Sequence, residues 1–324
     1  MLRTIRHLLI ISLMLSTTGI VSAADKASDA WLPEAVAGSQ WHGFKLETFK
    51  LKVDTFNLKE IQVEIAAPAK PVDGKPWVLF VGGLSYHSNL LEELLKKGVH
   101  VVTIASWNLF GSEKGLDLLD TLYDGVRKTR GLSGRVALYG VSRGGLTVYR
   151  YAARRPERIA AIYAEGAVMD FKSWPRGWKP AHRDWVNLKR HYEFKTEEEA
   201  LAFKGNPLDL LEPVAKARIP LRHLVRPDAE HDTKVVPYDA NTMEAQRRLK
   251  ALGHDMEVLT NQGPKFPLPS DPGTVDFILR SCRAVPAAPP HAKSPTTTPT
   301  DRLSFKQNAK PCWSWKERHE EELN

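Results

Sequence analysis

Hydrophobic residues follow two different periods along this chain of 324 residues. Between residues 44 and 68, apolar and polar positions alternate in two runs, Leu46–Leu51 and Ile61–Ile65. This alternation predicts an antiparallel hairpin. From residue 76 the pattern changes: short, wholly apolar runs take turns with segments whose apolar positions recur every three or four residues. Such runs are typical of buried strands and amphipathic helices in succession.

The second period predicts a parallel sheet. We expect buried strands at 77–81, 99–104, 136–139, 159–164, 221–225 and 256–259, and helices at 89–97, 116–128, 146–154 and 241–252. Strands that alternate with helices through short connections form a sheet covered on both faces. The fold class is therefore α/β, with a mostly parallel central sheet. Residues 24–45, ahead of it, are expected to be a linker and entry segment of the domain.

An insertion of about residues 170–212 interrupts the alternation after the strand that ends at Ala164. It carries Trp174, Trp178 and Trp185, interleaved with basic residues. Because ligands bind at the carboxyl edge of such sheets, the insertion is expected to be a cap whose tryptophans bind substrate. The alternative is an additional packing layer in which the tryptophans are core.

Both ends of the chain differ in composition from the domain at 24–283. Residues 1–23 combine early basic residues, the apolar run Leu8–Leu15 and a small-residue site at Val21–Ala23, which is the pattern of a secretory signal peptide. An uncleaved anchor is the alternative, although the run is short for a membrane span. We expect export to the periplasm or beyond. Residues 284–324 are rich in Pro, Thr and Lys, as in a flexible tail.

Charge and cysteine content exclude some functions. The formal net charge of +8 falls to +6 without Arg3 and Arg6, and the surplus is spread along the chain without the basic, aromatic stripe of a nucleic-acid binder. It suits acidic substrates or envelope polymers. No His, Cys or Asp cluster has the spacing of metal ligands, so neither a metal nor an organic cofactor is expected. Cys282 and Cys312 either form a disulfide that ties down the tail or stay apart.

The main chemical motif is Gly140-Val-Ser-Arg-Gly-Gly145, between the expected strand at 136–139 and the expected helix at 146–154. Strand, glycine turn, serine and helix in this order form a nucleophile elbow. The serine sits on a strained turn, and the glycines allow neighbouring backbone to approach. We therefore expect Ser142 to be a nucleophile.

From about Pro76 to Arg280 the chain resembles the α/β-hydrolases. It is similar to an exported bacterial branch in which the Ser142–Gly145 motif is followed by Asp170-Phe-Lys-Ser-Trp-Pro175 and a stretch like 204–213. The resemblance implies the α/β-hydrolase fold with a cap and a serine hydrolase. The substrate would be a small-molecule or carbohydrate ester, or, by analogy of fold alone, a peptide.

An oxyanion hole needs two backbone N–H donors. The resemblance places one on Arg143 and the other in the loop of Gly83 and Leu84, after the strand at 77–81. Glucuronoyl esterases also carry arginine after the serine, and there its side chain helps to hold the oxyanion. The alternative for the Arg143 guanidinium is a contact with a buried carboxylate such as Asp170 or Glu165.

The acid is expected after the strand at 221–225, where Asp232 is the first candidate and Asp228 the second. Glu165, at the end of an earlier strand, is a third. The base is harder to place. In the family a histidine follows the last strand, but residues 260–272 contain none, and Pro264 and Lys265 occupy its place.

Without a base, serine is a poor nucleophile. Candidate bases are Lys265, His231 and His87, whereas His254 should lie at the wrong end of the sheet. The sequence thus favours an exported serine esterase with an altered base. A catalytically defective protein that binds a ligand without turnover, or a peptidase, are the alternatives.

Overall fold

The computed structural model describes residues 36–86, 88–261 and 272–283. The predicted signal peptide and tail, and the candidate bases His87 and Lys265, lie outside these residues. So does Cys312, the expected partner of Cys282, and the disulfide stays a prediction.

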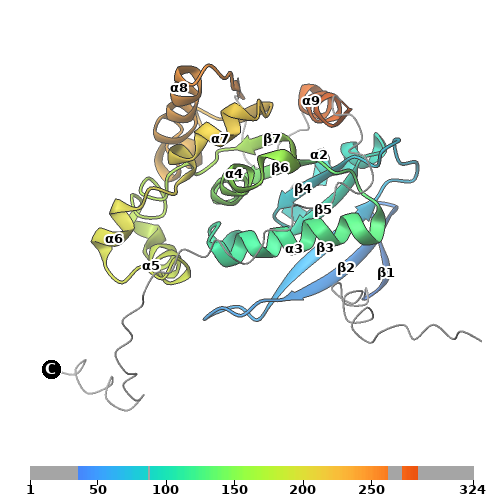
Figure 1. Cartoon of the computed structure of the whole chain (residues 1–324), viewed down its shortest axis with the longest axis horizontal. Coiled ribbons are helices and arrows are strands. Elements are labelled where there is room, and N and C mark those ends of the chain that lie inside the picture. The colour runs from blue at the N-terminus through green and yellow to red at the C-terminus, as the bar shows by residue number, and fades with distance from the viewer. Residues whose placement is uncertain (1–35, 87, 262–271, 284–324) are drawn as a thin grey trace, which may run out of the picture. The chain divides into compact units, whose positions relative to one another are not determined.

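A nine-stranded sheet forms the centre of the described residues, in the order β1-β2-β3-β5-β4-β6-β7-β8-β9 (Figure 1). Its strands are β1 (Val36–Trp41), β2 (Phe44–Lys52), β3 (Glu60–Ala67), β4 (Trp77–Val81), β5 (His100–Ile104), β6 (Val136–Val141), β7 (Ile159–Glu165), β8 (Leu221–Val225) and β9 (Glu257–Thr260). From β5 to β9 in this order, neighbours pair in parallel, and the first four strands pair antiparallel. The predicted fold class and the hairpin of β2 and β3 are confirmed.

Helices cover both faces of the sheet. They are α2 (Ser88–Lys96), α3 (Glu113–Arg130), α4 (Gly144–Arg154), α5 (His182–His191), α6 (Glu197–Ala202), α7 (Leu211–Lys216), α8 (Glu244–Ala251) and α9 (Pro272–Arg283). Apolar residues of α2 and α9 pack on one face, and those of α3, α4, α7 and α8 pack on the other. Along β4, Leu79 and Val81 face the second group, whereas Val78 and Phe80 face the first. Burial on both faces explains why the parallel strands read as continuous apolar runs.

The stretch expected to be a linker and entry segment, residues 24–45, contains a strand that the sequence did not predict, because β1 pairs antiparallel with β2 from residue 36 onward. The two strands are joined at His42 and Gly43, both of which have positive φ. This turn brings Trp41 opposite Phe44, so the strand depends on its partner more than on its own apolar pattern.

The inserted segment between β7 and β8 contains α5, α6 and short turns, and its apolar residues form a small cluster with Phe110, Leu146 and Val236 of the main domain. Phe171, Trp174, Trp185 and Leu188 are the insertion's largest buried members of this cluster. Asp184, on α5, contacts Arg143 beside the nucleophile elbow. The insertion therefore lies against the elbow.

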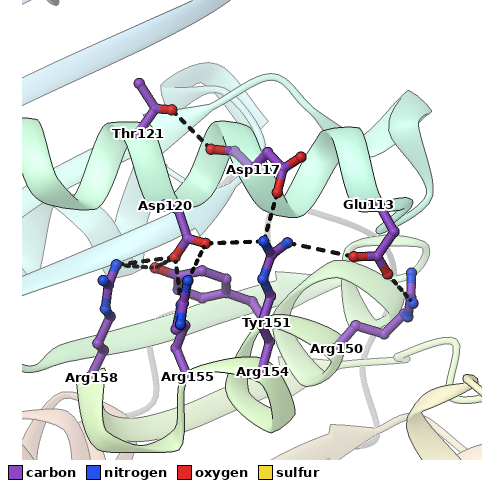
Figure 2. A network of polar contacts seen from close by, with 9 residues as sticks. All are labelled: Glu113, Asp117, Asp120, Thr121, Arg150, Tyr151, Arg154, Arg155 and Arg158. Carbon is purple, nitrogen blue, oxygen red and sulfur yellow. Dashed lines mark hydrogen bonds and ion pairs between the residues drawn. The ribbon is translucent and has the colours of Figure 1, made fainter. Parts of the chain in front are cut away.

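A polar network joins α3 to α4, the helix that follows the elbow (Figure 2). Asp120 of α3 accepts hydrogen bonds from Arg155 and Arg158 and also lies 3.4 Å from Arg154. Asp117 accepts a further bond of 2.6 Å from Arg154. The network fixes α4, and with it the elbow, on the sheet.

Candidate active site

Ser142 occupies the turn between β6 and α4 in a left-handed backbone conformation, with φ of +50°. Its N–H donates to the carbonyl of Glu165 at 2.9 Å. Its carbonyl accepts from the N–H groups of Gly145, at 3.0 Å, and Val168, at 2.9 Å. A non-glycine residue rarely adopts this conformation, and it persists only where surrounding structure enforces it. Three backbone hydrogen bonds enforce it here.

The glycines beside Ser142 are required by close backbone contacts. A Cβ at Gly145 would lie 2.7 Å from the carbonyl oxygen of Val168, and one at Gly140 would lie 3.0 Å from that of Gly144. Gly144 itself is less constrained, because its Cβ would lie an ordinary 3.4 Å from the Val81 oxygen. The packing reason predicted for the glycines holds at Gly140 and Gly145.

His231 lies beside Ser142. Its Nε2 is 3.1 Å from Ser142 Oγ, and its Nδ1 is 2.6 Å from Oδ1 of Asp232. Both residues belong to the wide helical turn His231–Val235, which follows β8. If Nδ1 carries the proton donated to Asp232, Nε2 is free to accept from the serine hydroxyl. Two of the sequence candidates, one base and one acid, are thus joined to the expected nucleophile.

Asp232 is fully buried and is held by Arg226 as well as by His231. Burial raises the pKa of this carboxyl, but the hydrogen bonds from His231 and Arg226 and the arginine charge outweigh it and lower the pKa below its ordinary value. Asp232 is therefore a carboxylate near neutral pH. Asp228, the second candidate acid, is exposed on the same loop.

Glu165, the third candidate acid, lies buried at the end of β7. Its carboxyl accepts a hydrogen bond of 2.7 Å from the Tyr139 hydroxyl, and burial raises its pKa. The carboxylate in contact with His231 is that of Asp232, whereas Glu165 holds Ser142 through its backbone carbonyl.

His254 hydrogen-bonds the carbonyl of Ile219, just before β8 begins. This is the amino edge of the sheet, as the sequence predicts for that histidine.

Gly166 shapes the site, and sequence reasoning missed it. It follows β7 with φ of +48°, and a Cβ there would lie 2.8 Å from Asp232 Oδ1 and 3.0 Å from His231 Cε1. The backbone of Gly166 therefore packs directly on the hydrogen bond between the two side chains. A glycine immediately after a buried strand, at the edge where ligands bind, was the available signal.

The candidate oxyanion donors divide into two groups. The N–H of Leu84 donates to Glu64 Oε2 at 3.0 Å, so Leu84 is engaged elsewhere. Among the described residues, no backbone carbonyl accepts from the N–H of Gly83 or from that of Arg143. Arg143 is the N-cap residue of α4, and N–H groups at the start of a helix have no partner inside it. The Arg143 N–H, on the residue after Ser142, is therefore an available donor.

The Arg143 guanidinium contacts neither Asp170 nor Glu165, the carboxylates named as its alternative partners. Its Nη1 donates to Asp184 Oδ1 at 3.1 Å and to Asn108 Oδ1 at 2.9 Å, and it lies 4.6 Å from the ring centre of Trp174. A carboxylate contact was the alternative to an oxyanion role for this side chain, and the partner is Asp184 of α5, 41 residues away.

A pocket of about 380 Å³ adjoins the elbow. Its walls are Phe80, Val81, Gly82, Trp107, Asn108, Val141 and Arg143. Trp107 and Asn108 follow β5 at the carboxyl edge, and sequence reasoning missed them. A mostly apolar wall with a few convergent polar groups is typical of a small-molecule site.

Solved structures share this architecture. The S-formylglutathione hydrolase of Agrobacterium tumefaciens superposes with a TM-score of 0.52 at 14% identity, over 77% of this chain and 96% of its own. The carboxyl esterase 2 of Tuber melanosporum gives 0.51 at 13%, over 77% and 88%. The chain has the α/β-hydrolase fold. No family model and no curated protein matches it.

The puromycin-hydrolyzing peptidase of Mycobacterium tuberculosis shares the α/β-hydrolase fold with this chain, at a TM-score of 0.52 and 15% identity. The match covers 74% of this chain but 38% of the peptidase. The chain therefore spans less than half the length of that protein.

The three candidate tryptophans of the insertion differ from one another in their surroundings. Trp174 and Trp185 are buried in the core of the insertion, and Trp185 Nε1 donates to Glu197 at 3.0 Å. Trp178 is half-buried and lines a separate hollow together with Trp185, Lys179 and His182. For Trp174 the packing alternative fits better than direct substrate contact.

Among the described residues, no helix is both long enough and apolar enough to cross a bilayer. In the same part of the chain, no three His, Cys, Asp or Glu side chains are grouped to hold a metal ion.

Proposed function

We propose that this chain is a serine hydrolase that cleaves carboxylic esters. The observation that carries the proposal is the continuous hydrogen-bonded series from Ser142 through His231 to Asp232. It lies where the loops after β6 and β8 meet, at the carboxyl edge of the sheet. A nucleophile, a base and an orienting carboxylate in this order activate serine.

The proposed reaction begins when Ser142 Oγ attacks the ester carbonyl and His231 Nε2 takes the hydroxyl proton. The developing oxyanion is held by the N–H groups of Arg143 and Gly83. The intermediate expels the alcohol, which receives the proton from His231, and leaves an acyl group on Ser142. Water, deprotonated by His231, then releases the acid and restores the serine.

Two observations favour an ester over a peptide as substrate. The ester and thioester hydrolases named above match this chain over 88% and 96% of their own lengths, whereas the peptidase matches over 38%. The pocket is also small, at about 380 Å³, and its mostly apolar wall suits a small acyl or alcohol group.

The first prediction uses a fluorophosphonate probe, which labels activated serines. The wild-type protein should be labelled stoichiometrically, and Ser142→Ala should not be labelled at all. Ser39→Ala, which removes an exposed serine on β1, is the matched control and should label fully. Absence of labelling in folded wild-type protein between pH 5 and 9 would support ligand binding without turnover instead.

Rates of hydrolysis measured in parallel on an aryl acetate and on a peptide anilide then rank the esterase against the peptidase.

We also propose that the protein is exported, because residues 1–23 have the pattern of a signal peptide. The exported bacterial branch that its Ser142–Gly145 motif resembles supports the same proposal. The second prediction is that the full chain, made in a bacterium, appears in the periplasmic or culture fraction with its amino terminus at Ala24. The same chain lacking residues 1–23 should stay with the cytoplasm. Equal fractionation of the two forms would contradict export.

A further inference from the structure

We propose that Arg226 is a positioning residue of this site, which orients the Asp232 carboxylate and through it aligns His231 with Ser142. The inference rests on the proposed function, because it assigns a role within the same hydrogen-bonded series.

Arg226 is the residue directly after β8, and it is 2% exposed. It holds both oxygens of Asp232. The Arg226 backbone N–H donates to Oδ2 at 2.8 Å, and its Nη2 donates to Oδ1 at 3.0 Å. Nε adds a longer contact of 3.4 Å to Oδ2. Oδ1 also accepts from His231, so any other orientation of the carboxylate would lose at least one of these contacts.

The need for such an anchor follows from the order of the residues. His231 and Asp232 are consecutive in a helical turn, and consecutive side chains on a helix point in different directions. The burial reflects this: the His231 side chain is 27% exposed and that of Asp232 is 0% exposed. A carboxylate that must turn back to its own neighbour needs a second contact to fix it. Arg226 supplies that contact from outside the turn.

Other ionisable groups surround Arg226. Glu165 on β7 is buried, and its carboxyl interacts with the hydroxyls of Tyr139 on β6 and Tyr163 on β7. Burial raises the Glu165 pKa, and the Asp232 charge raises it further, whereas the charge of Arg226 lowers it. One guanidinium thus offsets two buried carboxyl groups. Arg226 also lowers the pKa of Asp232. Without Arg226 this pKa would rise, and the carboxylate would become protonated at higher pH.

The test compares Arg226→Met, Arg226→Lys and the control Arg222→Met. Arg222 lies on β8, four residues before Arg226, and its side chain is 7% exposed and pairs with Glu257 through Nε and Nη2. The rates of ester hydrolysis and of probe labelling are measured against pH on folded protein, with folding followed by circular dichroism. We expect Arg226→Met to lower kcat by about 100-fold with little change in KM, as for a misplaced catalytic group. Its acidic limb should move to higher pH.

Arg226→Lys should restore the acidic limb and part of kcat, because lysine keeps the charge but lacks the planar fork. Arg222→Met should leave the pH profile unchanged. The inference is overturned if Arg226→Met keeps the wild-type kcat and profile, or if Arg222→Met changes them equally. If Arg226→Met does not fold, Arg226→Lys decides the matter, since wild-type kcat in that variant contradicts a positioning role. Failure of wild-type labelling overturns the proposed function and this inference together, whereas labelled wild type with unaffected variants overturns the inference alone.

Discussion

At the scale of single residues, the site depends on backbone that approaches side chains closely. Ser142 is held at positive φ by hydrogen bonds to the strand and loop beside it. One loop supplies both His231 and Asp232, so a disturbance of that loop displaces the proposed base and acid together. The backbone of Gly166 packs against the hydrogen bond between these two side chains.

The third prediction concerns Gly166→Ala. The new methyl would meet Asp232 and His231 at 3.0 Å or less, and it would place a side chain at positive φ. We expect activity to fall by about 100-fold through misalignment of His231, with a loss of about 1–2 kcal/mol in the free energy of unfolding. Gly253→Ala is the control, because that glycine has φ of +69° and no atom within 4 Å of its added Cβ. It should lose similar stability and keep its activity; equal loss of activity in both variants would contradict the contact.

At the scale of elements, α4 carries the elbow and is fixed to α3 by charge. The Asp120 side chain is 16% exposed and contacts three arginines, Arg154, Arg155 and Arg158. The Asp117 carboxylate pairs with Arg154, and this side chain is 64% exposed. Hydrogen bonds between charged groups contribute most where solvent is partly excluded, and exposed pairs contribute little.

The fourth prediction follows from this difference in exposure. Asp120→Asn should lower the free energy of unfolding by about 1–2 kcal/mol, because three guanidinium groups lose the negative charge of the carboxylate that they share. Asp117→Asn should lower it by less than about 0.5 kcal/mol. Urea denaturation of the two variants measures both values. Equal effects would show that burial of Asp120 does not strengthen the network.

At the scale of the whole molecule, the sheet was predictable because the parallel strands β4 to β8 are buried on both faces and are mostly apolar, whereas the edge strand β9 is partly exposed. The elbow was predictable because its turn needs glycine at fixed positions. β1 was not, since its pairing with β2 depends on a turn at His42 and Gly43. The partner of Arg143 was not predictable either, because only the folded insertion brings Asp184 to it.

The sequence reduced the candidate bases to a few residues but could not choose among them. The stretch at 260–272 lacks histidine, and Lys265, His231 and His87 were each open. Of these three, His231 lies among the described residues, where the wide turn after β8 brings it within 3.1 Å of Ser142 and buries Asp232. A local turn of this kind leaves no periodic signal in the sequence.

The most direct test of the account is the rate at which the fluorophosphonate probe labels Ser142 in His231→Gln and in Lys265→Ala. His231→Gln should slow labelling by about 100- to 10,000-fold, the range that a general base contributes. Lys265→Ala should label within about twofold of the wild type, because the proposed proton acceptor is His231 and not Lys265. Wild-type labelling in folded His231→Gln, together with loss of labelling in Lys265→Ala, would contradict the central claim that His231 is the base.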